Sequence, residues 1–320
     1  MINIAEESAI IIWDTATRTQ HFIRRASFET KAKDFGFLVP TPTVPKLEES
    51  DDAAFSFVAW LTRPPVSEDV RVMAKKADKA KAAPAPVTVI ATAKVAGYDA
   101  AVLEATDANA LDLWLKEHGY HSSPELRDWF KPYIEQKWKI TAFKIARDNA
   151  DAGKVNASAV RMSFQTEQPF FPYREPAAAP SRTDKSRTLR IFLLADARYK
   201  GRIGLGSGDT WPGRPVWSNK IADGNRVRLL RELKMPDTFA GASHLTEFVD
   251  NSSPRPGKDE LYLSRAADQS VLEKPPFDPS FEEPNLFWVL VVYLLFPAAA
   301  IVLAIWLVRK VRRGPTSARP

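Results

Sequence analysis

A single apolar segment near the carboxyl end constrains this chain more than any other feature. Residues 286–308 read LFWVLVVYLLFPAAAIVLAIWLV; they contain no charged or amide side chain, and Tyr293 is their one polar-tipped residue. At about 1.5 Å per residue, a helix of this length spans roughly 35 Å and crosses the ~30 Å hydrocarbon core of a bilayer. Helices in the cores of soluble proteins seldom contain so long an apolar run. The segment therefore predicts one carboxyl-terminal transmembrane helix.

Single residues within this segment fit a membrane anchor. The predicted span begins at Leu286 and ends at Val308. Trp288 and Trp306 fall near its two ends, at the depth where indole rings are favoured. Pro297, near the middle, removes one backbone hydrogen bond and predicts a kink, which transmembrane helices tolerate.

Charges on the two sides of the span predict its orientation. Glu282 and Glu283 precede the span, whereas its carboxyl side is basic. The predicted stop-transfer residues are Arg309, Lys310, Arg312 and Arg313. The positive-inside rule places residues 309–320 in the cytoplasm and residues 1–285 outside it. The lipid bilayer is thus the predicted partner, and contact of the tail with anionic lipid is a secondary effect.

An extracytoplasmic body of this size normally requires an export signal, and Met1–Trp13 does not resemble one. The stretch MINIAEESAIIIW has two acids, no basic residue and a short apolar run. Two interpretations remain. Either the true start lies upstream of Met1, where the genomic DNA would encode a signal peptide, or the chain is tail-anchored with its body in the cytoplasm. We favour the first, because the second would carry the basic tail across the membrane.

Composition excludes several classes of protein. The formal net charge is +6, but five basic residues lie within 309–320, and the rest of the chain carries +1. A nearly neutral body is poorly suited to neutralising phosphates, so nucleic acid is not an expected partner. The absence of cysteine excludes disulfide scaffolds, thiolate catalysis and Cys-ligated metal sites. With 45% hydrophobic and 26% charged residues, the chain is not broadly disordered.

The body predicts an α+β fold in which antiparallel β-sheets carry a packed helical hairpin. Alternating or β-branched runs predict strands at 9–13, 19–28, 87–95, 138–146, 160–164, 189–195 and 260–265. Residues 54–61 fit either a strand or a short helix. Low-complexity composition predicts loops at 71–86 and 173–188.

The helical hairpin has the clearest local signals. A helix over Asp107–His118 ends at Gly119. Ser123 caps the next helix and Pro124 occupies its first position. The apolar stripe of the second helix is formed by Leu126, Trp129, Phe130, Tyr133 and Ile134.

No residue is assigned to catalysis, to a cofactor or to a metal. His118 and His121 are three residues apart and are the one weak pair of metal candidates, but no third ligand lies close in sequence. They are therefore interpreted as polar loop residues. His21, in the first predicted hairpin, is interpreted as a cross-strand contact.

A glycine-rich stretch and several aromatic residues are the other candidates. KGRIGLGSGDTWPGRP, residues 200–215, matches neither GxxxxGK[ST] nor GxSxG, so Ser207 is not a nucleophile elbow. Asp209 and Trp211 remain candidates to line a ligand cleft. Aromatic residues of the hairpin region are interpreted as packing, with a sugar-stacking platform as the alternative: Trp114, Trp129, Tyr133 and Trp138.

The order of several motifs resembles a known family. The most specific are DFGFLVPTPTVPKLE at 34–48 and LDLWLKEHGYHSSPEL at 111–126; YIEQKWKITAFKI and LRIFLLADAR follow. Over about residues 5–200 this order resembles the domain-of-unknown-function 2330 family of bacteria and archaea. The resemblance implies an exported protein with an amino-terminal signal and often a carboxyl-terminal anchor. Members usually carry cysteines after the signal, which this chain lacks, and the resemblance implies no assigned activity.

These features together predict a single-pass membrane protein of the cell envelope whose extracytoplasmic domain has a binding or structural role. One alternative is an envelope hydrolase that uses carboxylates or the pair His118 and His121. It requires these histidines to meet an acid such as Glu117 or Asp209 in one pocket. The other alternative is a tail-anchored adaptor facing the cytoplasm. The sequence specifies neither a ligand nor an oligomeric state.

Overall fold

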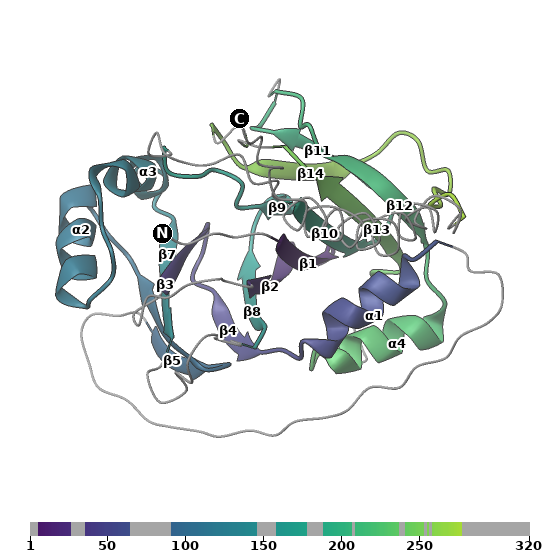
Figure 1. The fold of residues 1–320 in the computed structure, drawn as a ribbon, viewed down its shortest axis with the longest axis horizontal. Helices are drawn as coiled ribbons and strands as arrows, with labels where there is room; N and C mark the ends of the chain where they lie inside the picture. Colours follow the sequence, from purple (N-terminus) through teal and green to yellow (C-terminus); the bar gives the residue numbers. More distant parts are fainter. Residues whose placement is uncertain are drawn as a thin grey trace, which may run out of the picture. The chain divides into compact units, whose positions relative to one another are not determined.

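The computed structural model describes residues 6–26, 36–64, 91–145, 158–177, 188–206, 209–236, 241–252, 255 and 258–276. These residues form three β-sheets and four α-helices, and antiparallel pairing dominates the sheets (Figure 1). The predicted α+β class is therefore confirmed for the body.

The largest sheet has seven strands in the order β12-β13-β10-β1-β2-β8-β4. Its strands are β1 (Glu6–Asp14), β2 (Thr19–Ala26), β4 (Lys46–Glu49), β8 (Val160–Gln165), β10 (Thr188–Ala195), β12 (Arg214–Lys220) and β13 (His244–Asp250). Only β1 and β10 run parallel; the other neighbours in this sheet are antiparallel. The amino-terminal hairpin thus occupies the middle of the sheet.

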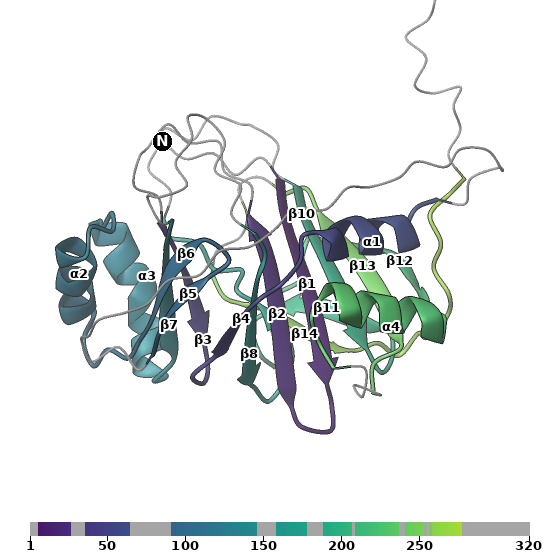
Figure 2. The ribbon, with the colours of Figure 1, turned by 90° about the horizontal axis from the view of Figure 1, so that it is seen from below.

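Both faces of this sheet are covered, as the strand β1 shows. Successive side chains of a strand point to opposite faces. Ile10 and Ile12 pack under the helices α1 (Ala53–Leu61) and α4 (Asp223–Glu232), which lie together on one side of the sheet (Figure 2). The stretch 54–61, for which strand and helix both fitted, is therefore a helix.

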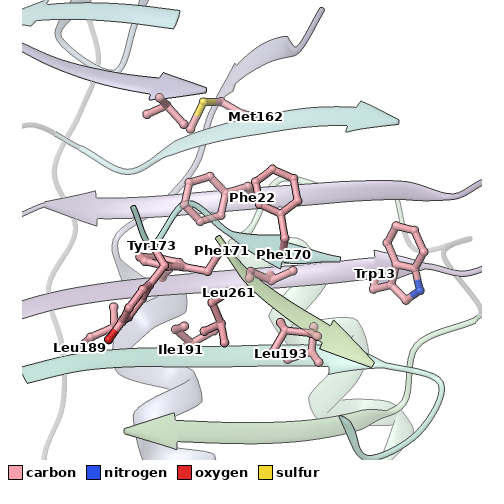
Figure 3. Packing of buried hydrophobic residues seen from close by; sticks show 14 of the residues in the cluster. Trp13, Phe22, Met162, Phe170, Phe171, Tyr173, Leu189, Ile191, Leu193 and Leu261 are labelled. Carbon is pink, nitrogen blue, oxygen red and sulfur yellow. The ribbon is translucent and has the colours of Figure 1, made fainter. Parts of the chain in front are cut away.

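The opposite face of the large sheet packs against a three-stranded sheet, ordered β11-β14-β9. Its strands are β9 (Phe170–Phe171), β11 (Tyr199–Ile203) and β14 (Leu261–Arg265). Trp13 and Phe22 of the large sheet share a buried cluster with Phe170, Phe171 and Leu261 (Figure 3). This second core fixes the segment that follows β9, which forms one wall of the site described below.

The third sheet has four strands in the order β3-β7-β6-β5 and carries the helical hairpin. Its strands are β3 (Gly36–Thr41), β5 (Ala91–Val95), β6 (Tyr98–Leu103) and β7 (Lys139–Ile145); the helices are α2 (Ala108–Glu117) and α3 (Pro124–Glu135). Asp107 accepts a hydrogen bond from the Ala110 backbone N–H at 3.0 Å, and Ser123 accepts one from that of Leu126 at 3.3 Å. The predicted hairpin and its Ser123 cap are confirmed.

Several predictions differ from the structure or fall outside its described part. The strand β6, the strands β11, β12 and β13 and the helix α4 were not predicted from the sequence. No helix in the described ranges is long and apolar enough to cross a bilayer. The predicted span 286–308, the tail 309–320 and the predicted loop 71–86 lie outside the described residues.

Candidate functional site

A cleft of about 360 Å³ lies where the large sheet, the strand β3 and the helical hairpin meet. This volume is within the range of small-molecule sites, roughly 300–1,000 Å³. Its lining combines apolar and charged side chains: Glu7, Phe22, Arg24, Phe37, Leu38, Val39, Pro40, Tyr120, His121, Leu126, Trp129, Lys144, Phe171, Pro172, Arg174, Glu175, Pro176 and Arg255, with Gly36 and Gly119.

Aromatic rings form much of the apolar surface. Phe22 comes from β2, Phe37 from β3 and Trp129 from α3. The Arg24 guanidinium lies 5.0 Å from the Phe37 ring centroid, a distance at which cations interact favourably with aromatic faces. Phe37 is also supported by Phe143, whose ring stacks on it with centroids 4.7 Å apart. The cleft therefore has a rigid apolar floor beside a fixed positive charge.

Gly36 allows the loop after α2 to approach β3. A Cβ atom at this position would lie 2.7 Å from the Phe143 carbonyl oxygen and 2.9 Å from the Tyr120 ring. Contacts that short do not occur for real side chains, so only glycine permits Tyr120 to close this side of the cleft. Burial raises the pKa of Tyr120 to about 12, so its hydroxyl stays protonated near neutral pH.

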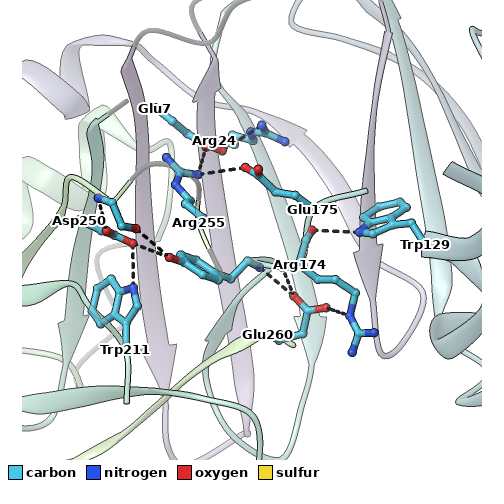
Figure 4. A network of polar contacts seen from close by, with 11 residues as sticks. Glu7, Arg24, Trp129, Arg174, Glu175, Trp211, Asp250, Arg255 and Glu260 are labelled. Atoms are coloured by element: carbon cyan, nitrogen blue, oxygen red, sulfur yellow. Dashed lines mark hydrogen bonds and ion pairs between the residues drawn. The ribbon is translucent and has the colours of Figure 1, made fainter. Parts of the chain in front are cut away.

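Two arginines share one carboxylate at the other side of the cleft (Figure 4). Arg24 Nη2 lies 2.9 Å from Glu7 Oε1, and Arg255 Nη1 lies 3.0 Å from Glu7 Oε2. The same Arg255 Nη1 lies 3.5 Å from Glu175 Oε1. Burial by itself would lower the pKa of Arg255, but Glu7 and Glu175 raise it above its ordinary value. Arg255 is therefore a permanent buried cation.

The arginines of this cleft have donors without acceptors. Arg255 is 7% exposed, and its Nε and Nη2 atoms have no hydrogen-bond partner. The Nε atom of Arg24 is also buried without one, whereas Arg174 Nε makes no hydrogen bond but lies 3.6 Å from Glu260 Oε1 as an ion pair. Buried polar groups in folded proteins are nearly always paired, and a group left unpaired marks a functional or solvent-filled position.

The wall segment 173–175 is held from two sides. The Tyr173 hydroxyl donates to Asp250 Oδ2 at 2.6 Å, and the Tyr173 N–H donates to Glu260 Oε2 at 2.8 Å. Trp129 Nε1 donates to the Arg174 carbonyl at 2.9 Å. Burial would raise the pKa of Asp250, but hydrogen bonds from Ser252, Tyr173 and Trp211 hold it below its ordinary range. This support places Glu175 beside Arg255 (Figure 4).

The two candidate metal ligands do not form a metal site in the described part of the chain. His121 lines the cleft, whereas His118 stacks on Trp114 with centroids 3.9 Å apart and contacts the Trp114 carbonyl through Nδ1 at 2.8 Å. No three His, Asp or Glu side chains of the described residues are placed to hold an ion. Glu117 and Asp209 are exposed and do not line the cleft. The cluster of two histidines and an acid that the hydrolase hypothesis requires is therefore not found in this cleft.

The remaining candidates divide between core and cleft. Trp211 does not line the cleft: it is buried, and its Nε1 donates to Asp250 at 3.0 Å. Ser207 lies outside the described residues. Trp114 and Trp138 pack against the core under the hairpin, and Trp129 does so too while lining the cleft. His21 is paired with Ser163 across β2 and β8, with Nδ1 and Oγ 2.8 Å apart, as a cross-strand contact predicts.

The charged residues of the cleft were missed by the sequence analysis, although two of them carry a signal. Glu7 is in phase with Ala9 and Ile11 of β1, and Arg24 is in phase with Phe22 of β2, so both are charged residues on an inward face. Such residues mark either an internal ion pair or a site. Arg255 has no comparable local pattern, because it belongs to none of the described helices and strands.

Comparison with known families identifies the chain. Residues 1–248 match the family described as "Uncharacterized protein conserved in bacteria (DUF2330)". The chain belongs to the DUF2330 family. The suspected resemblance is confirmed, and the DUF2330 match includes every charged residue of the cleft except Arg255.

No curated protein matches the chain. Among solved structures, the crystal structure of baculovirus P35 is similar with a TM-score of 0.38 and 8% identity, covering 86% of this chain and 98% of P35. The caspase-8/P35 complex gives a TM-score of 0.36 and 7% identity, covering 85% and 94%. Likeness at this level supports no conclusion about the fold or the function of this DUF2330 protein.

Proposed function

We propose that this DUF2330 protein is a single-pass membrane protein whose extracytoplasmic domain binds a small ligand at the cell envelope. The cleft supports the binding role: an apolar floor of aromatic rings adjoins Arg24 and the buried Arg255, which both have donors without a hydrogen bond. Small-molecule sites have this composition, mostly apolar with a few placed polar groups. In this role the domain binds its ligand and does not transform it.

The sequence supports the placement in the membrane. Residues 286–308 form the proposed anchor, and the basic residues of 309–320 hold the tail in the cytoplasm. The body, residues 1–285, then lies on the outer side of that membrane. Its cleft meets solutes of the envelope, and the bilayer is its proposed partner.

The lack of cysteine allows a direct test of this topology. Full-length chains with Thr210→Cys, at an exposed body position, or Ser317→Cys, in the tail, each carry one thiol. We expect a membrane-impermeant maleimide to label Thr210→Cys in intact spheroplasts and Ser317→Cys only after lysis. The parent chain, which has no thiol, is the control. The reverse pattern would establish the tail-anchored, cytoplasm-facing alternative and would overturn the proposal.

A further inference from the structure

We propose that the cleft binds an organic carboxylate with an apolar body, and that Arg255 holds the carboxylate with Arg24 beside it. This inference rests on the proposed ligand-binding function and adds the chemical class of the ligand. It follows from three observations: the unpaired edge of Arg255, the grouping of unpaired donors at one cleft, and the apolar lining.

The first observation concerns the two edges of the Arg255 guanidinium. Nη1 contacts Glu7 and Glu175, whereas Nε and Nη2 have no acceptor. The Nε and Nη2 N–H groups lie on one edge of the planar guanidinium and point the same way. That edge matches the two oxygens of a carboxylate, which arginine binds in bidentate fashion. A lysine could not replace this geometry.

The second observation is where the unpaired donors lie. Of the seven buried side-chain atoms without a hydrogen bond among the described residues, three belong to Arg24 and Arg255 of this cleft, and a fourth, Arg174 Nε, has only an ion pair with Glu260 at 3.6 Å. Glu7 already accepts from Arg24 and from Arg255, one oxygen each. Neither of these oxygens reaches Arg24 Nε, Arg255 Nε or Arg255 Nη2, and a bound anion or water would supply the acceptor that these donors lack.

The third observation limits the kind of anion. The lining has four Lys or Arg residues and two carboxylates, Glu7 and Glu175, so its net positive charge attracts an anion. If the cleft held only an inorganic ion, the partly exposed rings of Phe37 and Trp129 would remain in contact with water. A carboxylate attached to an aryl or acyl group satisfies both the charge and the apolar surface.

The experiment uses the full chain in phosphatidylcholine nanodiscs and isothermal titration calorimetry. The probes are 4-phenylbutyrate and octanoate, each paired with its neutral carboxamide, and phenyl phosphate. We expect at least one carboxylate to bind about tenfold or more tightly than its amide, because the amide cannot form the charge-assisted bidentate pair. Tighter binding of 4-phenylbutyrate indicates an aromatic acid, and tighter binding of octanoate indicates an acyl chain such as lipids release.

Variants locate the binding group. Arg255→Lys keeps the positive charge but loses the two adjacent N–H donors of the guanidinium edge, and Arg24→Gln removes the neighbouring cation. Each variant is expected to bind the carboxylate about tenfold or more weakly. Arg190→Lys is the matched control, because Arg190 forms a 2.7 Å ion pair with buried Glu247 and does not line the cleft. Circular dichroism and thermal melting verify that each variant is folded.

Each outcome decides the inference. If amides bind as tightly as acids, the cleft binds ligands but not through a carboxylate, and the inference is wrong while the binding function stands. If no carboxylate binds, or if phenyl phosphate binds more tightly than both carboxylates, the assigned class is wrong. Weakening by Arg190→Lys equal to that by Arg255→Lys places the effect outside the cleft. The thiol-labelling result tests the membrane proposal separately from all of these.

Discussion

At the scale of single residues, His21 couples protonation to folding. It lies between β2 and β8, paired with Ser163. Burial, and secondly the charge of Arg161, lower the pKa of His21 to about 4, while Asp14 and Glu48 act weakly in the opposite direction. The folded state therefore binds fewer protons than the unfolded state between this value and the ordinary value of 6.5.

The chain is expected to lose stability as the pH falls. The stability that depends on neutral His21 is fully present above about pH 6.5 and is lost progressively towards about pH 4. The free energy of unfolding falls by at most about 3 kcal/mol over this range. Thermal melting of the full chain at about pH 7 and about pH 5 measures this. His21→Gln, which stays neutral, should show a smaller decrease between the two conditions. Equal decreases in the parent and the variant would contradict the assignment to His21.

Tyr173 is the residue that fixes the cleft wall. Tyr173→Phe removes the 2.6 Å hydrogen bond to buried Asp250. We therefore expect the free energy of unfolding, measured by urea titration, to fall by about 1–3 kcal/mol. Tyr262→Phe is the control, because the Tyr262 ring is also packed against the core but its hydroxyl makes no hydrogen bond among the described residues. A loss for Tyr262→Phe as large as that for Tyr173→Phe would show that ring environment, not the bond to Asp250, determines the effect.

At the scale of elements, local signals were sufficient for the hairpin and insufficient for the rest. Ser123, Pro124 and the apolar stripe of α3 act within one element, and they predicted it correctly. The helix α4 contains Gly224, and five of its ten residues are Arg, Asp or Glu, so no apolar stripe was apparent. The strand β13 buries the adjacent polar residues Thr246 and Glu247 between Leu245 and Phe248, so polar and apolar residues do not alternate along it.

The strand β3 depends on Gly36 for its close contact with the loop after α2. Gly36→Ala places a Cβ 2.7 Å from the Phe143 carbonyl, a backbone atom that cannot move freely. We expect a loss of about 1–3 kcal/mol in stability, as for other overpacked sites, together with weaker ligand binding. Gly224→Ala in α4 has nothing within 4 Å of its Cβ and should be neutral or stabilising. Denaturant titration of both variants compares their free energies of unfolding. Equal values would show that β3 moves to accommodate the added methyl group and would contradict the prediction.

At the scale of the whole molecule, the fold class was predictable and the site was not. The α+β class follows from the periodicity of apolar residues within each segment, which predicts helix or strand without knowledge of the tertiary contacts. The cleft requires Glu7, Arg24, Glu175 and Arg255 to meet: Glu7 and Arg24 lie on the paired strands β1 and β2, but Glu175 and Arg255 lie far from them in sequence and outside the described strands. Glu7 and Arg24 are charged residues at inward-facing positions of β1 and β2, and this indicates a polar contact in the interior. Their partners are set by tertiary packing, which no pattern in one segment encodes.

The proposed anchor gives a prediction for the complete chain. Truncation after residue 285 removes the apolar segment and the basic tail but none of the described contacts. We expect the full chain to stay in the membrane pellet after alkaline carbonate extraction and the truncated chain to appear in the soluble fraction. The truncated chain should still bind the carboxylate probe. A full chain that is extracted as readily as the truncated one would exclude residues 286–308 as an anchor.

The parallel pairing of β1 with β10 has a consequence for how the molecule acquires its structure. Ile11 lies opposite Leu193, so the centre of the large sheet cannot close until about residue 195 has been synthesised. Pairings this distant in sequence slow folding. Until then the hairpin of β1 and β2 displays Ile10, Ile12 and Trp13 to solvent. Nascent chains shorter than this should be readily digested by protease and should need a chaperone to keep them from aggregating.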